Sequence, residues 1–128
     1  MADKIRILVV EDETSVAMMM VFLLSRAGCD VQTAWNAEGA MQLAQAGDFD
    51  LITLDIDLPG ATGFEIFSRL KQIACWHDTP VVFVSGRPYE DDQQRAVELG
   101  AVDYIFKPFD ALDFAPRLLS HLKTGAMT

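Results

Sequence analysis

Short apolar runs alternate along this chain with longer segments in which apolar residues recur at helical spacing. An apolar run without polar alternation predicts a strand that is covered on both faces, as in a parallel sheet. The pattern predicts five strands, over residues 5–10, 31–34, 51–54, 80–84 and 102–106. It also predicts five helices, over residues 15–27, 37–46, 64–74, 90–99 and 111–123.

Capping and breaking residues separate these segments. We expect Thr14 or Ser15 to cap the first helix, Asn36 the second and Asp110 the fifth, because short polar side chains satisfy free backbone N–H groups there. Pro116 lies inside the fifth predicted helix. It should remove one backbone hydrogen bond and kink that helix.

Strands that alternate with helices predict an α/β fold with a parallel sheet, helices on both faces and right-handed crossovers. The run over residues 31–34 is more polar than the others and suits a sheet edge. The strand order 2-1-3-4-5 follows, which is the doubly wound, flavodoxin-like (βα)5 arrangement. The direction of winding reverses between the first and third strands and creates a crevice at their carboxyl ends. Residues 1–128 are expected to form one domain.

Charge and composition exclude several classes of partner. Nineteen acidic residues against ten basic ones give a net charge of −9, which argues against direct contact with nucleic acid or an anionic membrane. The start has no signal-peptide pattern, and no apolar stretch reaches the ~20 residues that span a bilayer. Cys29 and Cys75 are too few for a disulfide framework and should be reduced. We therefore expect a cytoplasmic protein.

Polar side chains stand at the predicted carboxyl ends of four strands. They are Glu11 and Asp12 after the first, Asp55 and Asp57 after the third, Ser85 after the fourth and Lys107 after the fifth. Taken alone, Asp55 is equally consistent with a turn residue. Carboxylates brought together repel, so a proton or a cation must bind, and an all-oxygen set suits Mg²⁺. With a hydroxyl and an ammonium beside them, these groups match the needs of phosphoryl transfer.

These motifs, in this order at separate strand ends, resemble the CheY-like receiver domain of two-component response regulators. The resemblance covers residues 4–123. By position, Asp55 matches the phosphoacceptor, Ser85 the family's Ser/Thr, Lys107 its invariant lysine and Tyr104 its aromatic switch residue.

The resemblance also implies a set of metal ligands. Asp12, Asp55 and the backbone carbonyl of Asp57 would ligate Mg²⁺, with Glu11 acting mainly through water. It further implies a cis Lys107–Pro108 peptide, which proline makes accessible.

The function implied by the resemblance is regulatory rather than that of a turnover enzyme. Asp55 would accept a phosphoryl group from a sensor histidine kinase or a histidine phosphotransfer protein. Ser85 and Tyr104 would then rearrange, and a downstream effector protein would read the face made by the fourth helix, fifth strand and fifth helix. The same face is a candidate for a homodimer contact. No output domain is expected within residues 1–128.

Asp57 and Arg87 stand two residues after the acceptor and the switch serine, at positions that influence phosphoryl lifetime in the family. We hypothesise that they pair across the site mouth and limit water access; the alternative is that both are solvated. The acidic run over residues 90–94 is predicted to form a solvated face. Phe106 is predicted either to be buried against a helix or to be exposed as a contact residue. Neither His77 nor His121 has the setting of a phosphotransfer histidine.

The sequence is also compatible with two other functions. One is an interaction module that keeps the fold without phosphorylation, although every residue that the chemistry needs is present. The other is a phosphatase, because Asp55-Ile56-Asp57 resembles the Asp-x-Asp motif of haloacid-dehalogenase-like hydrolases. That family places its motif after the first strand, whereas here it follows the third.

Overall fold

The computed structural model describes residues 4–73 and 78–122. The strands are β1 (Arg6–Val10), β2 (Asp30–Ala34), β3 (Leu51–Leu54), β4 (Val81–Ser85) and β5 (Asp103–Phe106). The helices are α1 (Thr14–Arg26), α2 (Ala37–Ala46), α3 (Gly63–Gln72), α4 (Glu90–Leu99) and α5 (Ala111–Leu119). Strands and helices alternate along the described chain, as the apolar pattern predicts.

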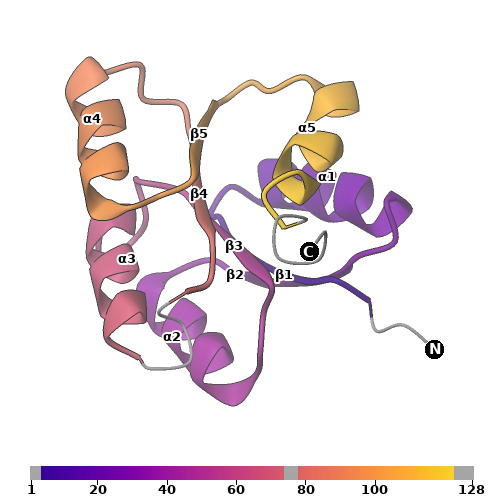
Figure 1. The fold of residues 1–128 in the computed structure, drawn as a ribbon, viewed down its shortest axis with the longest axis horizontal. Helices are drawn as coiled ribbons and strands as arrows, with labels where there is room; N and C mark the ends of the chain where they lie inside the picture. Colours follow the sequence, from indigo (N-terminus) through magenta and orange to yellow (C-terminus); the bar gives the residue numbers. More distant parts are fainter. Residues whose placement is uncertain (1–3, 74–77, 123–128) are drawn as a thin grey trace.

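All five strands are parallel and lie in the order β2-β1-β3-β4-β5, so the predicted fold class and strand order are confirmed. Helices α1 and α5 cover one face of the sheet, and α2, α3 and α4 cover the other (Figure 1). In register, Val10 at the end of β1 is level with Leu54 at the end of β3. The residues that follow these two strands therefore emerge side by side.

The core consists of two apolar clusters separated by the sheet, because successive strand residues point to opposite faces. Leu8 and Ile52 belong to the cluster under α2 and α3, and Ile7 and Leu51 to the cluster under α1 and α5. These side chains are fully buried. Each contributes on the order of 2 kcal/mol by burial, which makes the central strands a rigid base for the residues at their ends.

Helix boundaries differ from the prediction by one residue at both ends of α1 and at the start of α3, and by more at the end of α5. Helix α1 begins at Thr14 with Glu13 as its N-cap and no side-chain cap, so the expected cap by Thr14 or Ser15 is wrong. The caps by Asn36 and Asp110 are confirmed, since their carboxamide and carboxylate oxygens accept hydrogen bonds from the backbone N–H groups of Gly39 and Leu112.

Helix α5 ends at Leu119, before the expected residue 123. The backbone N–H groups of His121 and Leu122 bond to carbonyls three residues back, which tightens the chain into short turns and stops the α-helical pattern. Pro116 lies inside α5 as expected, and the kink there stays a prediction. The expected end of α3 at residue 74 lies outside the described residues; its last described helical residue is Gln72.

None of the described helices has the length and apolar character needed to cross a bilayer.

Candidate functional site

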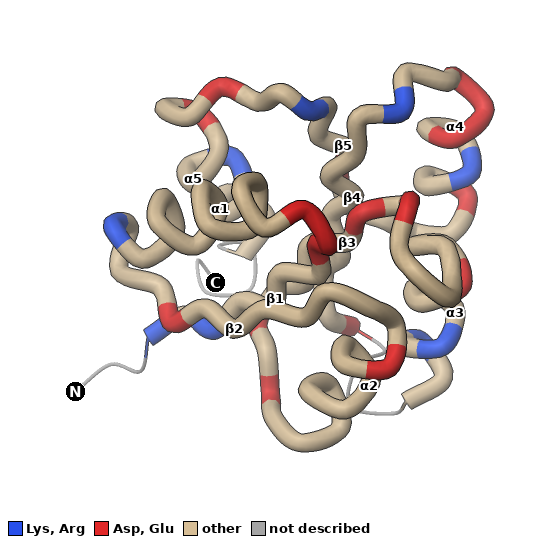
Figure 2. Tube along the Cα trace, turned by 180° about the vertical axis from the view of Figure 1, so that it is seen from behind, with Lys and Arg blue, Asp and Glu red and all other residues tan. Residues whose placement is uncertain are grey.

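The candidate site lies at the carboxyl ends of β1 and β3, where the strand order reverses. The backbone N–H of Asp55 donates to the carbonyl of Val10 at 3.1 Å, which extends the β1–β3 pairing by one residue. Asp55 is thereby held beside Glu11. Acidic residues gather at this end of the sheet (Figure 2). The predicted carboxylates thus lie at the end of the sheet where the strand order reverses.

Glu11, Asp12 and Asp55 form a cluster of carboxylates. Each offers one oxygen, and these oxygens all lie within 4.8 Å of one another. Glu11 and Asp55 are buried, at 3% and 5% exposure, while Asp12 is exposed, so the cluster opens to solvent on one side. The backbone N–H of Asp57 donates to Asp55 Oδ1 at 3.3 Å, which places the chain after the acceptor against the same cluster.

Lys107 reaches this cluster from the end of β5. Its ammonium nitrogen lies 2.9 Å from Glu11 Oε1 and 3.3 Å from Asp55 Oδ2. Its backbone N–H donates to the carbonyl of Ser85 at 2.9 Å, which aligns the ends of β4 and β5. Glu13, which directly follows Asp12 in the sequence, lies 3.5 Å from the same ammonium. One cation therefore faces at least three carboxylates.

The pKa values reflect this excess of negative charge. Burial raises the pKa of Glu11 to about 7; its hydrogen bond to Lys107 opposes the rise and the charge of Asp55 adds to it. Burial alone would lower the pKa of Lys107, but its bond to Glu11 and the charges of Asp55 and Glu11 outweigh burial and raise it. A divalent cation would relieve the repulsion that Lys107 leaves uncompensated. The all-oxygen donor set fits Mg²⁺ in chemistry.

Gly63, the first residue of α3, allows this helix to pack against the acceptor loop. A Cβ atom at this position would collide with the backbone carbonyl of Asp55 and lie 3.0 Å from Ile56 Cα. The backbone N–H of Gly63 donates to the carbonyl of Ile56 at 2.9 Å. The close approach leaves no room for a side chain and fixes the backbone around Asp55.

Ser85 and Tyr104 both bond to the backbone of Arg87. Ser85 is fully buried, and its hydroxyl accepts a hydrogen bond from the Arg87 N–H at 3.1 Å. The Tyr104 hydroxyl donates to the Arg87 carbonyl at 3.0 Å. Phe106 stays 42% exposed, with its ring 5.2 Å from that of Tyr104, which decides between the two placements expected for it. The two predicted switch residues are thus linked through one loop residue.

The Arg87 side chain spans the mouth of the site. Its Nη1 lies 3.1 Å from Asp57 Oδ1, so the hypothesised pair is within ion-pair distance; its effect on phosphoryl lifetime stays a prediction. Its Nε donates to Asp92 Oδ2 at 2.8 Å. Asp92 is buried, so the prediction that residues 90–94 form a solvated face is wrong at this residue. Asp92 lies four residues before the buried Ala96 and therefore on the same face of α4, and this spacing is the sequence signal that could have indicated its burial.

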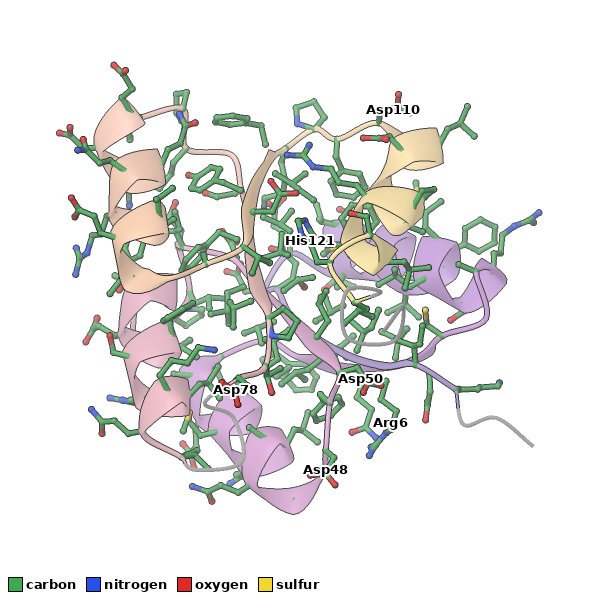
Figure 3. The ribbon with its side chains drawn as sticks, viewed as in Figure 1. Arg6, Asp48, Asp50, Asp78, Asp110 and His121 are labelled. Atoms are coloured by element: carbon green, nitrogen blue, oxygen red, sulfur yellow. The ribbon has the colours of Figure 1, made fainter. Side chains whose placement is uncertain are left out.

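The expected cis Lys107–Pro108 peptide is present. His121 lies beyond the end of α5 (Figure 3). Its Nε2 lies 3.0 Å from Asp103 Oδ2, so its contact is with β5 and not with the carboxylate cluster. Cys29 is buried, and burial raises the pKa of its thiol. His77 and Cys75 lie outside the described residues.

Comparisons with known proteins agree with this geometry. Residues 7–118 match the response regulator receiver domain family. The chain is 37% identical over 120 residues to the transcriptional activator protein IrlR of Burkholderia pseudomallei, covering 94% of this chain and 51% of that protein. It is 39% identical over 113 residues to the phosphate regulon transcriptional regulatory protein PhoB of Klebsiella pneumoniae, covering 88% and 49%. The chain spans about half the length of these relatives.

Solved structures give the same result. The Vibrio cholerae chemotaxis protein CheY4 superposes with a TM-score of 0.87 at 27% identity, covering 94% of this chain and 99% of that one. A CheY-like receiver domain from Methanospirillum hungatei has a TM-score of 0.90 over 98% of both chains and, at 23% identity, supports the fold alone. From the family match over most of its length and the carboxylate site at the expected strand ends, the chain belongs to the response regulator receiver domain family.

Proposed function

We propose that this domain is a Mg²⁺-dependent phosphoacceptor in which Asp55 takes a phosphoryl group from a phosphohistidine. The donor would be a sensor histidine kinase or a histidine phosphotransfer protein. The observation that carries the proposal is the placement of Asp55 within 3.3 Å of the Lys107 ammonium, in one carboxylate cluster with Glu11 and Asp12. Receiver domains are regulatory proteins, and this chemistry modifies the protein itself.

Each residue has a defined part in the transfer. A carboxylate oxygen of Asp55 would bond to phosphorus while the bond from phosphorus to the donor nitrogen breaks, which gives an acyl phosphate and a free imidazole. Lys107 would stabilise the negative charge on the transferred oxygens. Asp12, Asp55 and the backbone carbonyl of Asp57 would hold Mg²⁺, with Glu11 acting through water. Bound Mg²⁺ supplies further charge neutralisation on the phosphoryl group.

The output would be a change in protein contacts. The Ser85 hydroxyl would turn towards the new phosphoryl group, and Tyr104, whose hydroxyl donates to the Arg87 carbonyl, would move into the space that Ser85 leaves. Phe106 and Tyr104 pack against each other at the surface of β5, so this movement would reshape the face of α4, β5 and α5. A downstream effector, or a second copy of this chain, would read that face.

The surface beside the site suits a partner that carries the phosphohistidine. A groove of about 990 Å³ runs from Glu11 and Asp12 along α1. Three large apolar side chains in its lining are at least half exposed, Met18 at 66%, Phe22 at 56% and Trp35 at 66%. An exposed apolar patch of this kind marks a contact surface. Its position would bring a docked partner next to Asp55.

The experiment is labelling with acetyl phosphate, a small donor that needs no partner. The wild type should be labelled in Mg²⁺ and remain unlabelled in EDTA, and Asp55→Asn should not be labelled in either. Asp57→Asn is the matched control, because only its backbone carbonyl is assigned a ligand role and labelling should persist. Labelling of Asp55→Asn at the wild-type level would refute the proposal.

A further inference from the structure

Asp92, in the first turn of α4, makes a contact that the proposed chemistry does not use. Tyr89, at the N-cap of α4, provides no side-chain cap, and the Asp92 carboxylate instead accepts a hydrogen bond from Arg87 Nε at 2.8 Å. A carboxylate at this position of a helix commonly reaches back to the N-cap, as Glu65 does to Thr62 at the start of α3. In α4 the carboxylate is directed to the loop after β4.

The Arg87 side chain bonds to Asp92 and to Asp57, and the bond to Asp92 is the stronger of the two. The Asp92 side chain is 12% exposed, while that of Asp57 is 66% exposed. The distance to Asp92 is also shorter, 2.8 Å against 3.1 Å. A charged pair shielded from water is stronger than an exposed one, so Asp92 fixes the position of the guanidinium and Asp57 meets it there.

Several contacts restrain Arg87 in this arrangement. Its backbone N–H and carbonyl bond to Ser85 and Tyr104, and its guanidinium carbon lies 5.4 Å from the ring centre of Tyr89. With Nε held by Asp92, Nη1 donates across the site mouth to Asp57 Oδ1 at 3.1 Å. A freed Arg87 side chain would have several rotamers available, and only some of them cover the mouth.

We propose that Asp92 is a positioning residue for the phosphoacceptor site, holding the Arg87 guanidinium across the site mouth so that the acyl phosphate on Asp55 is lost more slowly. This inference rests on the proposed function. In the loss reaction, water attacks phosphorus, the bond from phosphorus to the Asp55 oxygen breaks, and the products are inorganic phosphate and the Asp55 carboxylate. A partner that moves the first turn of α4 would displace Asp92 from Arg87 Nε and so change the lifetime of the phosphoryl group.

The test measures the half-life of the label after acetyl phosphate is removed. Asp92→Asn should shorten the half-life about two- to fivefold, as expected for the loss of a half-shielded charged contact. Asp91→Asn is the matched control: it removes the same charge from the same turn of α4 at an exposed position, and the half-life should not change. Equal effects of the two substitutions would assign the change to the helix terminus and overturn the proposal.

A double-substitution comparison separates positioning from a purely structural role. In the Arg87→Ala background, Asp92→Asn should have no further effect on the half-life, because its target is gone. The same shortening in both backgrounds would overturn the proposal. Circular dichroism of each variant would check that the total helix content is unchanged.

A second readout needs no phosphoryl donor. The Nε–H proton of Arg87 should give a protected NMR signal in the wild type and in Asp91→Asn, and lose that protection in Asp92→Asn. Protection that persists in Asp92→Asn would overturn the positioning step. Failure to label the wild type would instead refute the proposed function and the lifetime claim with it, so the two failures are distinguishable.

Discussion

Asp103 connects β5 to α5 beside the switch residue Tyr104, and its removal gives a quantitative test of the electrostatics. Its two carboxylate oxygens accept hydrogen bonds from Arg117 at 2.7 Å and 2.8 Å. One of them lies 3.0 Å from His121 Nε2, and the other accepts from the backbone N–H of Tyr104 at 2.8 Å. The Asp103 side chain is 18% exposed and that of Arg117 is 40% exposed, so water screens these contacts in part.

The magnitude follows from the pKa of Asp103. Burial alone would raise this pKa, but the hydrogen bonds from Arg117, His121 and Tyr104 outweigh burial and lower it from 3.8 to about 2. At ~1.4 kcal/mol for each pKa unit, the ionised carboxylate stabilises the folded state by about 2 kcal/mol. Because the folded-state pKa is the lower one, this contribution is complete above pH 3.8 and is lost as the pH falls through about 2.

The perturbation is Asp103→Asn, which keeps the shape and an oxygen for the Tyr104 N–H but removes the charge. Urea unfolding at pH 7 should give a free energy of unfolding about 2 kcal/mol below that of the wild type. The difference between the two proteins should fall to about half by pH 3. Asp48→Asn is the control: Asp48 is exposed (Figure 3), and the free energy of unfolding should change little.

Two results would refute this reasoning. A difference that is as large at pH 3 as at pH 7 would mean that packing, not charge, sets the cost of the substitution. No difference at pH 7 would mean that desolvation of the Asp103–Arg117 pair cancels its attraction.

Two further substitutions test the packing around the site. Gly63→Ala should lower the free energy of unfolding by about 2 kcal/mol or more and slow labelling, because backbone atoms of Asp55 and Ile56 must move. Gly86→Ala is the control, since no atom lies near the added methyl group, and it should have little effect on the free energy of unfolding. Equal losses of stability in the two variants would contradict the argument. Thr53→Val should raise the free energy of unfolding by about 1 kcal/mol, because Thr53 Oγ1 is buried without a partner among the described residues. Differential scanning calorimetry would measure this change, and a loss of stability would mean that the hydroxyl has a partner such as a buried water.

The fold could be predicted because its signal lies in local patterns. Strand β3 is buried on both faces, so its sequence is dominated by apolar residues, which predicts a central strand. Strand β2 is more polar, which predicts a strand at the edge of the sheet. Strand order then follows from chain connectivity. Because parallel strands end at one edge, the convergence of Glu11, Asp55 and Lys107 follows from the order without any knowledge of side-chain positions.

Other features depend on contacts that a linear pattern does not encode. Asp92 is surrounded by polar residues in sequence, which predicts a solvated side chain, yet tertiary packing turns it towards Arg87. The early end of α5 comes from the short turns after Leu119, which no glycine or proline announces. Which acids Lys107 contacts depends on the rotamers of Glu11 and Glu13, which the sequence leaves open.

The most direct test of the central claim is to locate the phosphoryl group. After reaction with acetyl phosphate and Mg²⁺, borohydride would reduce an aspartyl phosphate to homoserine, and peptide mass spectrometry would identify its position. The account predicts modification at Asp55 alone, and none when Mg²⁺ is chelated. Modification at Asp12 or Asp57 with Asp55 unchanged, or none at all in Mg²⁺, would contradict it.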